Sequence, residues 1–283
     1  MTEILKGKPV ADAITEELKE RCEKLKEKGI TPTLAIIRVG EREDDLSYER
    51  GAGKRAELVG AKVFNVVFPE DVSKDTLFAK IKELNEDNNV HGILLFRPLP
   101  KHIDSDAARK LIAPSKDVDG CTDASLAGVF TGTKLGFAPC TAESAVAILK
   151  HYNIPISGSR AVVIGRSLVI GRPVALLLMH ENATVTVCHT RTKDVPAVAK
   201  EADILIAASG VMESIGCEYT NKEQTIIDVG ISFNEEKGKR CGDVKYDEVF
   251  EKVKAITPVP GGVGSVTTAI LFKHVIESAE KNA

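Results

Sequence analysis

The sequence contains no long apolar run, and this absence limits where the protein can work. No stretch of the chain stays apolar for the roughly 18 residues that a membrane-spanning helix needs. The N-terminal segment MTEILKGKPVADAITEELKE becomes charged within a few positions and lacks the apolar core of a signal peptide. We therefore expect a cytoplasmic protein that is neither secreted nor inserted in a membrane.

Paired cysteines and an excess of one charge are also missing. The cysteines are scattered, with no C-x-x-C pair and no Cys/His cluster at metal-ligand spacing. This pattern predicts reduced thiols and no metal site. A formal net charge of -3 provides no broad basic surface for a polyanion, so we expect no nucleic-acid partner. Small molecules are the more reasonable ligands.

The first part of the sequence alternates between helical and β patterns. Apolar residues recur at helical spacing between Pro9 and Lys28, and the run TLAIIRVG that follows is typical of a buried strand. Strands that alternate with helices predict a parallel sheet with helices on its faces. Further helices are expected at 48–59 and 74–85, and further strands at 61–67 and 92–96.

The second part of the sequence has the pattern of a nucleotide-binding domain. After Asp119 the sequence is loop-like until a helix expected from Thr141 to His151. Beyond it, short helical stretches separate the β-rich runs RAVVIGRS, ATVTVCHT, DILIAASG and TIIDVGI, a series that predicts a Rossmann-type sheet. A last helix is expected from Thr267 to Ala279. The length of 283 residues fits two domains better than one.

A glycine-bounded turn lies at the start of this second part. The first of its strands leads into Gly165-Arg166-Ser167 and then, after three apolar residues, into Gly171-Arg172-Pro173 and a helix. Glycines at both ends of such a turn let backbone N–H groups approach a pyrophosphate, and proline suits the first turn of a helix. The spacing is not the usual G-x-G-x-x-G, so the motif alone also fits a tight turn between a strand and a helix. The repeated strands favour the cofactor interpretation.

The end of the next strand bears on the choice of cofactor. Many NAD-binding folds place a carboxylate there for the ribose 2′-hydroxyl, whereas this sequence has His189-Thr190-Arg191-Thr192. Arg191, with Arg166 and Ser167 nearby, has the charge to bind a 2′-phosphate, which favours NADP over NAD. A solvated loop residue is the alternative interpretation of Arg191.

Several segments of the sequence resemble one enzyme family. Their order and spacing match the bifunctional methylenetetrahydrofolate dehydrogenase/cyclohydrolase family over essentially the whole chain, and the combination of ITPVPGGVG with GRSxxxGRP is highly specific. The segments are KDVDG (Lys116–Gly120), PCT (Pro139–Thr141), VVIGRSLVIGRP (Val162–Pro173), NATVTVCHTRT (Asn182–Thr192), IIDVGI (Ile226–Ile231), GDV (Gly242–Val244) and ITPVPGGVG (Ile256–Gly264).

The resemblance implies a fold, a reaction and partners. The fold would combine a three-layer α/β domain for the folate substrate (1–140, completed by the C-terminal helix at 265–283) with a Rossmann-type NAD(P)-binding domain (141–264) across a cleft. The reaction would oxidise 5,10-methylenetetrahydrofolate by hydride transfer to the nicotinamide of NADP, or of NAD. Such chemistry requires mainly positioning, and no metal. The assembly would be a homodimer.

The resemblance also assigns site residues. Tyr48 and Asp119 match the catalytic-site tyrosine and aspartate, and a carboxylate suits the N–H donors of a pterin edge. Pro260 and Gly261 match the loop that closes over the substrate. Taken alone, Asp119 would be a turn residue and Tyr48 a half-buried helix aromatic. The implied cofactor contacts are Gly165, Arg166, Ser167, Gly171, Thr190, Arg191 and Ile231.

The sequence departs from the family where the second, hydrolytic activity is expected. The family pattern Y-V-x-x-K-x-K has a lysine four residues after the tyrosine, and this substrate-facing position is Ala52 here. Lys54 cannot stand in for it, because two further residues turn a helix by roughly 200°. The glutamine of the family's V-Q-L-P-L-P is replaced by Phe96. Because both polar partners of the substrate-binding site are replaced together, we expect the cyclohydrolase activity to be lost.

The leading expectation is thus a monofunctional dehydrogenase that works with a separate cyclohydrolase. One alternative is a bifunctional dehydrogenase/cyclohydrolase. Another is a folate- or nucleotide-binding protein whose catalysis has lapsed, against which the intact Arg166, Ser167 and Gly171 argue. A third is another two-domain dehydrogenase of the shikimate type, which ITPVPGGVG and KDVDG do not support.

Overall fold

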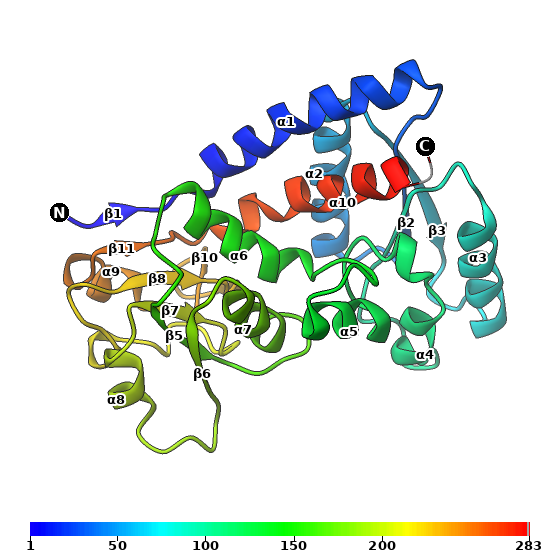
Figure 1. The fold of residues 1–283 in the computed structure, drawn as a ribbon. Helices are drawn as coiled ribbons and strands as arrows, with labels where there is room; N and C mark the ends of the chain where they lie inside the picture. The colour runs from blue at the N-terminus through cyan, green and yellow to red at the C-terminus, as the bar shows by residue number, and fades with distance from the viewer. Residues whose placement is uncertain (282) are drawn as a thin grey trace. The chain divides into compact units, whose positions relative to one another are not determined.

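The structure is a computed structural model that describes residues 1–281 and 283 and divides into two compact units (Figure 1). Unit 1 comprises Met1–Asp12 and Thr141–Thr267, and unit 2 comprises Ala13–Cys140 and Thr268–Ala283. The first twelve residues therefore lie in unit 1, whereas the expected boundary placed them in the N-terminal domain. The reason is that β1 (Glu3–Ile4) pairs in parallel with β11 (Ala255–Ile256) in the sheet of unit 1.

Unit 2 is built on a parallel sheet in the order β3-β2-β4. Its central strand is buried on both faces: Ile37 belongs to an apolar core with Leu77 and Ile81, and Ile36, on the opposite face, is also fully buried. Burial on both faces explains why Leu34–Ile37 is a continuous apolar run instead of an alternating one. The strands are β2 (Thr33–Val39), β3 (Lys62–Phe68) and β4 (Gly92–Leu95).

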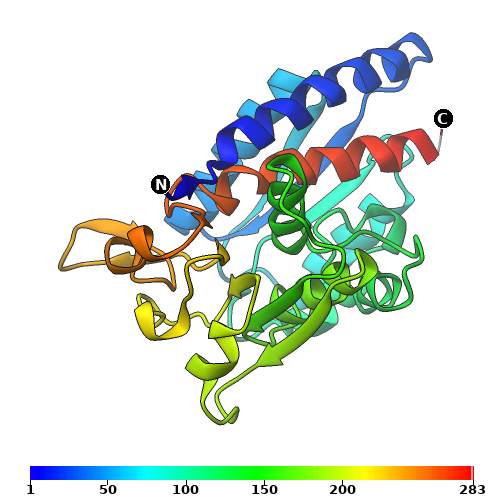
Figure 2. The ribbon, with the colours of Figure 1, turned by 60° about the vertical axis from the view of Figure 1, so that its left-hand side comes forward.

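Helices pack around the sheet of unit 2. In both views α1 and α10 lie side by side (Figures 1 and 2), and Arg21 of α1 forms an ion pair of 2.7 Å with Glu280 of α10. Short helices α4 and α5 lie where no helix was expected, and each begins at a side-chain cap, Asp104 and Thr122 respectively. They are too short for apolar periodicity to reveal them. The helices are α1 (Gly7–Glu27, which begins in unit 1), α2 (Glu43–Val59), α3 (Lys74–Glu86), α4 (Ser105–Lys110), α5 (Asp123–Thr131), α10 (Thr267–Lys281) and a 3₁₀ turn at Pro114–Lys116.

Unit 1 is built on a parallel sheet in the order β1-β11-β8-β7-β5-β6. The chain passes from β5 to β6 on one side and then crosses back to β7 on the other side of β5. This order confirms the predicted Rossmann-type sheet. It also makes the C-terminal end of β5 the switch point, which is where open α/β sheets bind their ligands. The remaining strands of this sheet are β5 (Arg160–Ile164), β6 (Thr184–Cys188), β7 (Ile204–Ala207) and β8 (Thr225–Asp228).

The core of unit 1 forms where the strands of this sheet face their helices. Val162, Leu205 and Ile226, from three neighbouring strands, are almost fully buried in it. Among the residues that the structure describes, no helix has the length and apolar character needed to cross a membrane. The other elements are α6 (Cys140–His151), α7 (Gly171–His180), α8 (Val195–Lys200), α9 (Tyr246–Val249), the antiparallel pair β9 (Ser232–Asn234) and β10 (Lys239–Cys241), and 3₁₀ turns at Cys217–Tyr219, Phe250–Lys252 and Val263–Ser265.

Candidate active site

The KDVDG segment of unit 2 begins with two residues, Lys116 and Asp117, whose charged groups hydrogen-bond to the protein backbone. The buried ammonium group of Lys116 donates hydrogen bonds to the carbonyl oxygens of Leu84 (2.9 Å) and Asp87 (2.7 Å), at the end of α3. These carbonyls belong to the last turn of a helix, where intrahelical donors run out. Burial lowers the pKa of Lys116. The lysine therefore serves as a buried cap of α3.

Asp117 has a similar structural role at the start of α5. Its carboxylate accepts hydrogen bonds from the backbone N–H groups of Cys121 (3.0 Å) and Thr122 (2.7 Å) and from the Ser125 hydroxyl (2.6 Å). Gly120 has a φ of +67°, and a Cβ there would lie 2.5 Å from the carbonyl carbon of Ala138. Only glycine fits this position without backbone movement.

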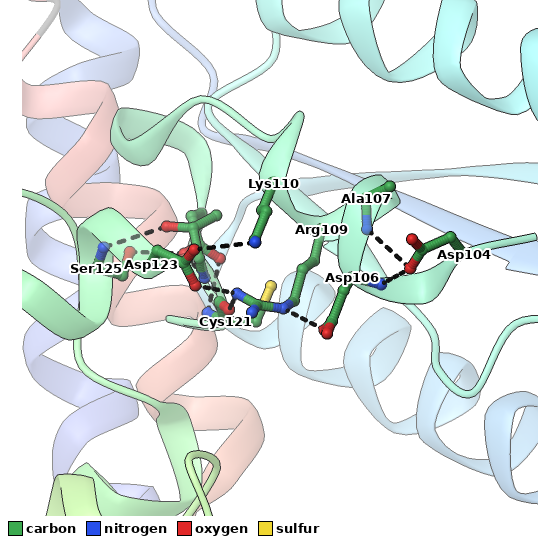
Figure 3. A network of polar contacts seen from close by, with 10 residues as sticks. Asp104, Asp106, Ala107, Arg109, Lys110, Cys121, Asp123 and Ser125 are labelled. Atoms are coloured by element: carbon green, nitrogen blue, oxygen red, sulfur yellow. Dashed lines mark hydrogen bonds and ion pairs between the residues drawn. The ribbon is translucent and has the colours of Figure 1, made fainter.

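A network of hydrogen bonds around Arg109 of α4 stabilises the backbone at Cys121, directly after the KDVDG segment (Figure 3). The guanidinium donates to Asp106 (2.9 Å), to Asp123 (2.8 Å) and to the carbonyl oxygen of Cys121 (2.9 Å). Hydrogen bonding to Asp106 raises the pKa of Arg109, and its side chain is 9 % exposed. The guanidinium therefore joins α4 to the beginning of α5 directly after the KDVDG segment.

Asp119 is placed differently from Lys116 and Asp117. Its side chain remains 31 % exposed, and its Oδ2 lies 3.9 Å from Nη2 of Arg97. Burial raises the pKa of Asp119 to about 6, although Arg97 acts in the opposite direction. A carboxylate in this setting is ionised at neutral pH and can accept N–H donors from a ligand.

Tyr48, Ala52 and Phe96 are brought to the same part of unit 2. The rings of Tyr48 and Phe96 meet edge to face, with centroids 5.8 Å apart and planes at 85°. Phe96 directly follows β4 and precedes Arg97, which connects this aromatic pair to Asp119. One turn along α2 from Tyr48, Ala52 is fully buried.

Two cationic residues follow Ala52 on α2, and neither takes the place of the missing lysine. Lys54 is exposed to solvent. Arg55 donates a hydrogen bond to the hydroxyl of Thr15 on α1. Neither side chain replaces a lysine at the position of Ala52.

The expected cofactor turn of unit 1 begins at the switch point of the sheet. Gly165 follows β5 with a φ of +125°, and a Cβ on it would lie 1.9 Å from the carbonyl oxygen of Ala208. A Cβ on Gly171 would lie 2.3 Å from the carbonyl oxygen of Gly165. Both glycines are therefore required by close backbone approach, which leaves a turn of bare backbone before α7. Such a turn at a helix N-terminus fits a pyrophosphate.

The turn carries exposed polar side chains. The Ser167 hydroxyl accepts hydrogen bonds from the N–H groups of Ile170 (3.1 Å) and Gly171 (3.4 Å), within the turn that leads into α7. Arg166 is exposed beside it. Besides its predicted cofactor contact, Ser167 therefore has a structural role in the turn.

The loop after β6 lies at the same edge of the sheet as this turn. Ile164 at the end of β5 pairs with Cys188 at the end of β6, and the N–H of Gly165 donates to the Cys188 carbonyl (2.9 Å). Beyond β6 the N–H of Arg191 donates to Nδ1 of His189 (3.1 Å), which forms a tight turn with Thr190 and Arg191 exposed. The loop that carries Arg191 and the glycine turn thus leave the sheet at the same edge from neighbouring strands.

The remaining predicted residues of unit 1 lie in exposed loops. Ile231, 59 % exposed, follows the end of β8. Pro260 and Gly261 follow β11, and the Gly261 carbonyl accepts a hydrogen bond from the N–H of Gly7 (2.8 Å). Gly261 has a φ of +101°. The loop is therefore anchored at the start of α1.

Two buried carboxylates of unit 1 were not among the site residues predicted from the sequence. Burial raises the pKa of Asp228 to about 6, against the N–H groups of Val244, Asp243 and Gly230 that donate to it. Asp243 accepts hydrogen bonds from the Ser209 hydroxyl (2.9 Å) and the Gly210 N–H (2.8 Å), in the loop after β7. The segments IIDVGI and GDV contain these residues, but spacing alone does not show that they meet.

Comparisons with known proteins identify the family of both parts of the chain. Residues 5–119 match the catalytic domain, and residues 139–283 the NAD(P)-binding domain, of the family described as tetrahydrofolate dehydrogenase/cyclohydrolase. A relative from Carboxydothermus hydrogenoformans named "Bifunctional protein FolD" is 51% identical over 281 residues, covering 99% of this chain and 98% of its own.

Solved structures give the same result. The bifunctional FolD dehydrogenase/cyclohydrolase of Campylobacter jejuni has a TM-score of 0.96 and 39% identity, with 100% of both chains covered. The FolD of Trypanosoma brucei, solved with NADP cofactor and inhibitor, has a TM-score of 0.92 and 34% identity, covering 99% of this chain and 98% of its own. The chain belongs to the tetrahydrofolate dehydrogenase/cyclohydrolase family and is an NAD(P)-dependent oxidoreductase of that family.

Proposed function

We propose that the chain oxidises 5,10-methylenetetrahydrofolate to 5,10-methenyltetrahydrofolate with NADP. The observation that carries this proposal is the partial exposure of the Asp119 carboxylate. The other charged residues of its segment, Lys116 and Asp117, are bound to the protein's own backbone instead. An ionised carboxylate can take two N–H donors from the aminopyrimidinone edge of a pterin. Tyr48 and Phe96 supply an aromatic wall. Pro260 and Gly261 are proposed as further substrate contacts.

The protein's part in this reaction is mainly positioning. When bound, the nicotinamide accepts the hydride, and the lone pair of the substrate nitrogen drives its departure. Holding donor and acceptor in register can supply most of the required acceleration without a charged catalyst at the reacting carbon. Asp119 would orient the pterin, and the backbone turn at Gly165 would hold the pyrophosphate.

NADP is proposed over NAD because of the basic side chains at the edge of the unit 1 sheet. Arg166 and Arg191 are exposed on adjacent turns after β5 and β6. A guanidinium fits a 2′-phosphate, whereas a ribose hydroxyl is usually recognised by a carboxylate. The relative from Trypanosoma brucei was solved with NADP, which supports the same choice. Thr190, Ser167, Gly171 and Ile231 are proposed as the other cofactor contacts.

We further propose that the chain lacks cyclohydrolase activity. Hydrolysis of the methenyl product needs a group that moves protons while water attacks, and Ala52 and Phe96 have none to offer. Arg97 is close, but a guanidinium stays protonated and is a poor general base. The alternative is that both activities are present, and the relatives favour it, because they are named bifunctional.

One experiment separates these functions. Purified protein is mixed with methylenetetrahydrofolate and NADP, and reduced cofactor and methenyltetrahydrofolate are followed separately by absorbance. We expect both products to form together, and added methenyltetrahydrofolate to decay at the buffer rate measured with heat-inactivated protein. Enzyme-dependent decay would establish the bifunctional alternative. Binding of both ligands without reduced cofactor would instead indicate a protein whose catalysis has lapsed.

Assembly and location belong to the same proposal. A homodimer is proposed from family membership. A cytoplasmic location is supported by all six cysteines being free thiols.

A further inference from the structure

His274 of α10 contacts the backbone beside Asp119. The imidazole is 2 % exposed, and its Nδ1 lies 2.8 Å from the carbonyl oxygen of Val118. The Cys140 thiol lies 3.2 Å from the same oxygen and 3.8 Å from Nδ1 of His274. Because a carbonyl oxygen only accepts, Nδ1 must carry the proton in this contact. The Val118 carbonyl therefore receives donors from two elements that are distant in sequence.

The orientation of the imidazole is set by packing. His274 stacks on Phe137 with ring centroids 4.8 Å apart and planes at 27°. The Lys281 ammonium in turn lies 4.7 Å from the Phe137 ring centroid. A ring held in this way cannot swing away from the Val118 carbonyl without losing the stacking contact.

A second side chain of α10 holds the other end of the same segment. The Ser278 hydroxyl donates to the carbonyl oxygen of Ser115 (2.8 Å). Residues four apart share a helix face, so His274 and Ser278 act on one stretch of chain from the same side. That stretch runs from Ser115 to Val118, directly before Asp119, and is thereby attached to α10 at both ends.

The contact with Val118 bears directly on Asp119. The carbonyl of one residue and the N–H of the next lie in one planar peptide unit. A hydrogen bond that fixes the Val118 oxygen therefore also fixes the orientation of the backbone at Asp119. Burial raises the pKa of Asp119, and His274 is among the groups that oppose this. The imidazole thus lies where it can act on the carboxylate through the shared peptide unit as well as electrostatically.

We propose that His274 is a positioning residue for substrate binding: its Nδ1–H bond to the Val118 carbonyl sets the Asp119 carboxylate in the direction that binds the pterin edge. This inference rests on the proposed role of Asp119. It predicts that substrate affinity depends on a donor at the Nδ1 position, and that cofactor affinity does not.

Asparagine and glutamine at position 274 provide a matched pair. An asparagine amide can place its N–H where Nδ1 stands, whereas the longer glutamine side chain places it further out. We expect His274→Asn to keep the KM for methylenetetrahydrofolate within about twofold, and His274→Gln to raise it about five- to tenfold, as the loss of one buried hydrogen bond would. The KM for NADP should stay within about twofold in both. Lys273→Ala, which removes a partly exposed side chain that pairs with Glu277 on the same helix, is the control and should leave both constants unchanged.

A double-substitution cycle tests whether His274 acts through Asp119. In an Asp119→Asn background, His274→Gln should change the substrate KM by less than about twofold, because coupled residues are not additive. A full additive effect there would overturn the proposal. Equal KM values for the asparagine and glutamine variants, or a parallel rise for NADP, would overturn it as well, because either result indicates a general structural role.

Measurements on the unaltered protein cover the case in which the variants do not fold. Nitrogen-15 NMR of labelled histidine should show one imidazole protonated at Nδ1 that shifts when tetrahydrofolate is added but not when NADP is added. The absence of such a signal would overturn the proposal. Failure of the proposed function has a different signature, because unaltered protein would then produce no reduced cofactor, while calorimetric binding of tetrahydrofolate would still report on the variants.

Discussion

Arg97 and Asp119 lie 3.9 Å apart in unit 2, and Arg97 directly follows Phe96, whose ring contacts Tyr48. The pair is about one quarter to one third exposed, with Arg97 at 27 % and Asp119 at 31 %. Solvent therefore screens their attraction, and Arg97 offsets the effect of burial on the pKa of Asp119 only in part. The carboxylate stays accessible to a ligand and changes charge in an experimentally accessible pH range.

Substrate binding should weaken in acid. The pKa of Asp119 is raised to about 6, so the carboxylate is ionised above that value and protonated below it. We expect the KM for methylenetetrahydrofolate to be flat above the pKa and to rise as the pH falls through it, with the KM for NADP unaffected. Asp119→Ala should raise the substrate KM roughly ten- to hundredfold, the loss of a charged hydrogen bond. A flat pH profile together with unchanged turnover in Asp119→Ala would contradict the assignment.

Removing the cation opposite Asp119 should move this profile. Arg97 lowers the pKa of Asp119, so Arg97→Ala should shift the acid limb of the substrate KM to higher pH. Lys101→Ala removes an exposed cation from the same loop and serves as the control. A matching shift in both variants would mean that the general charge of the loop is responsible, and not the pairing with Asp119.

Cofactor preference should depend on Arg191. We expect Arg191→Ala to raise the KM for NADP roughly tenfold or more and to leave the KM for NAD within about twofold, because only NADP carries a 2′-phosphate. Arg172→Ala, which removes an exposed arginine from α7, is the matched control. Ser167→Ala is a less specific test, because the hydroxyl also accepts a hydrogen bond from Ile170 within the turn, and its loss costs about 1 kcal/mol of stability. Equal losses for NADP and NAD in Arg191→Ala would assign that arginine to the pyrophosphate or to the loop.

Hydrolysis should appear when the two replaced side chains are restored. We expect the double variant Ala52→Lys with Phe96→Gln to decompose methenyltetrahydrofolate faster than buffer, because a lysine beside Tyr48 would supply the missing proton transfer. Ala52 is fully buried, so Ala52→Lys alone should lower the melting temperature by leaving an ammonium group without its glutamine. Adding Lys54→Ala to the double variant should change nothing. Hydrolysis by the unaltered protein would refute the explanation from Ala52 and Phe96.

The glycine at the switch point should be essential for folding as well as for cofactor binding. Gly165→Ala combines a φ of +125° with a Cβ placed 1.9 Å from the Ala208 carbonyl oxygen, and should cost about 3 kcal/mol or more. Gly158→Ala, at a φ of +78° with no atom near the added Cβ, isolates the conformational strain and should cost about 1–2 kcal/mol. Thermal unfolding with and without NADP compares them. Equal costs would show that close approach to Ala208 does not matter.

Local pattern was sufficient for the long elements of both units. The period of the apolar residues predicted α1 and α3, and the β-rich runs predicted the strands β5 to β8, because each of these elements buries a face of its own. The pattern failed for α4 and α5, which are short and begin at caps that also occur in turns. It gave no sign of the pairing between β1 and β11, since a two-residue strand has too few side chains to show its partner.

The sequence by itself determined the family, through the order of its motifs, and the residue types available at each site. Only the tertiary structure decided what each motif residue does. Three charged residues within four positions have different roles. Lys116 caps the end of α3, Asp117 accepts hydrogen bonds from the backbone before α5, and Asp119 remains partly exposed. The contact between Val118 and His274 joins residues 156 positions apart. Local sequence cannot reveal such roles, because burial and hydrogen-bond partners depend on which distant segments pack together.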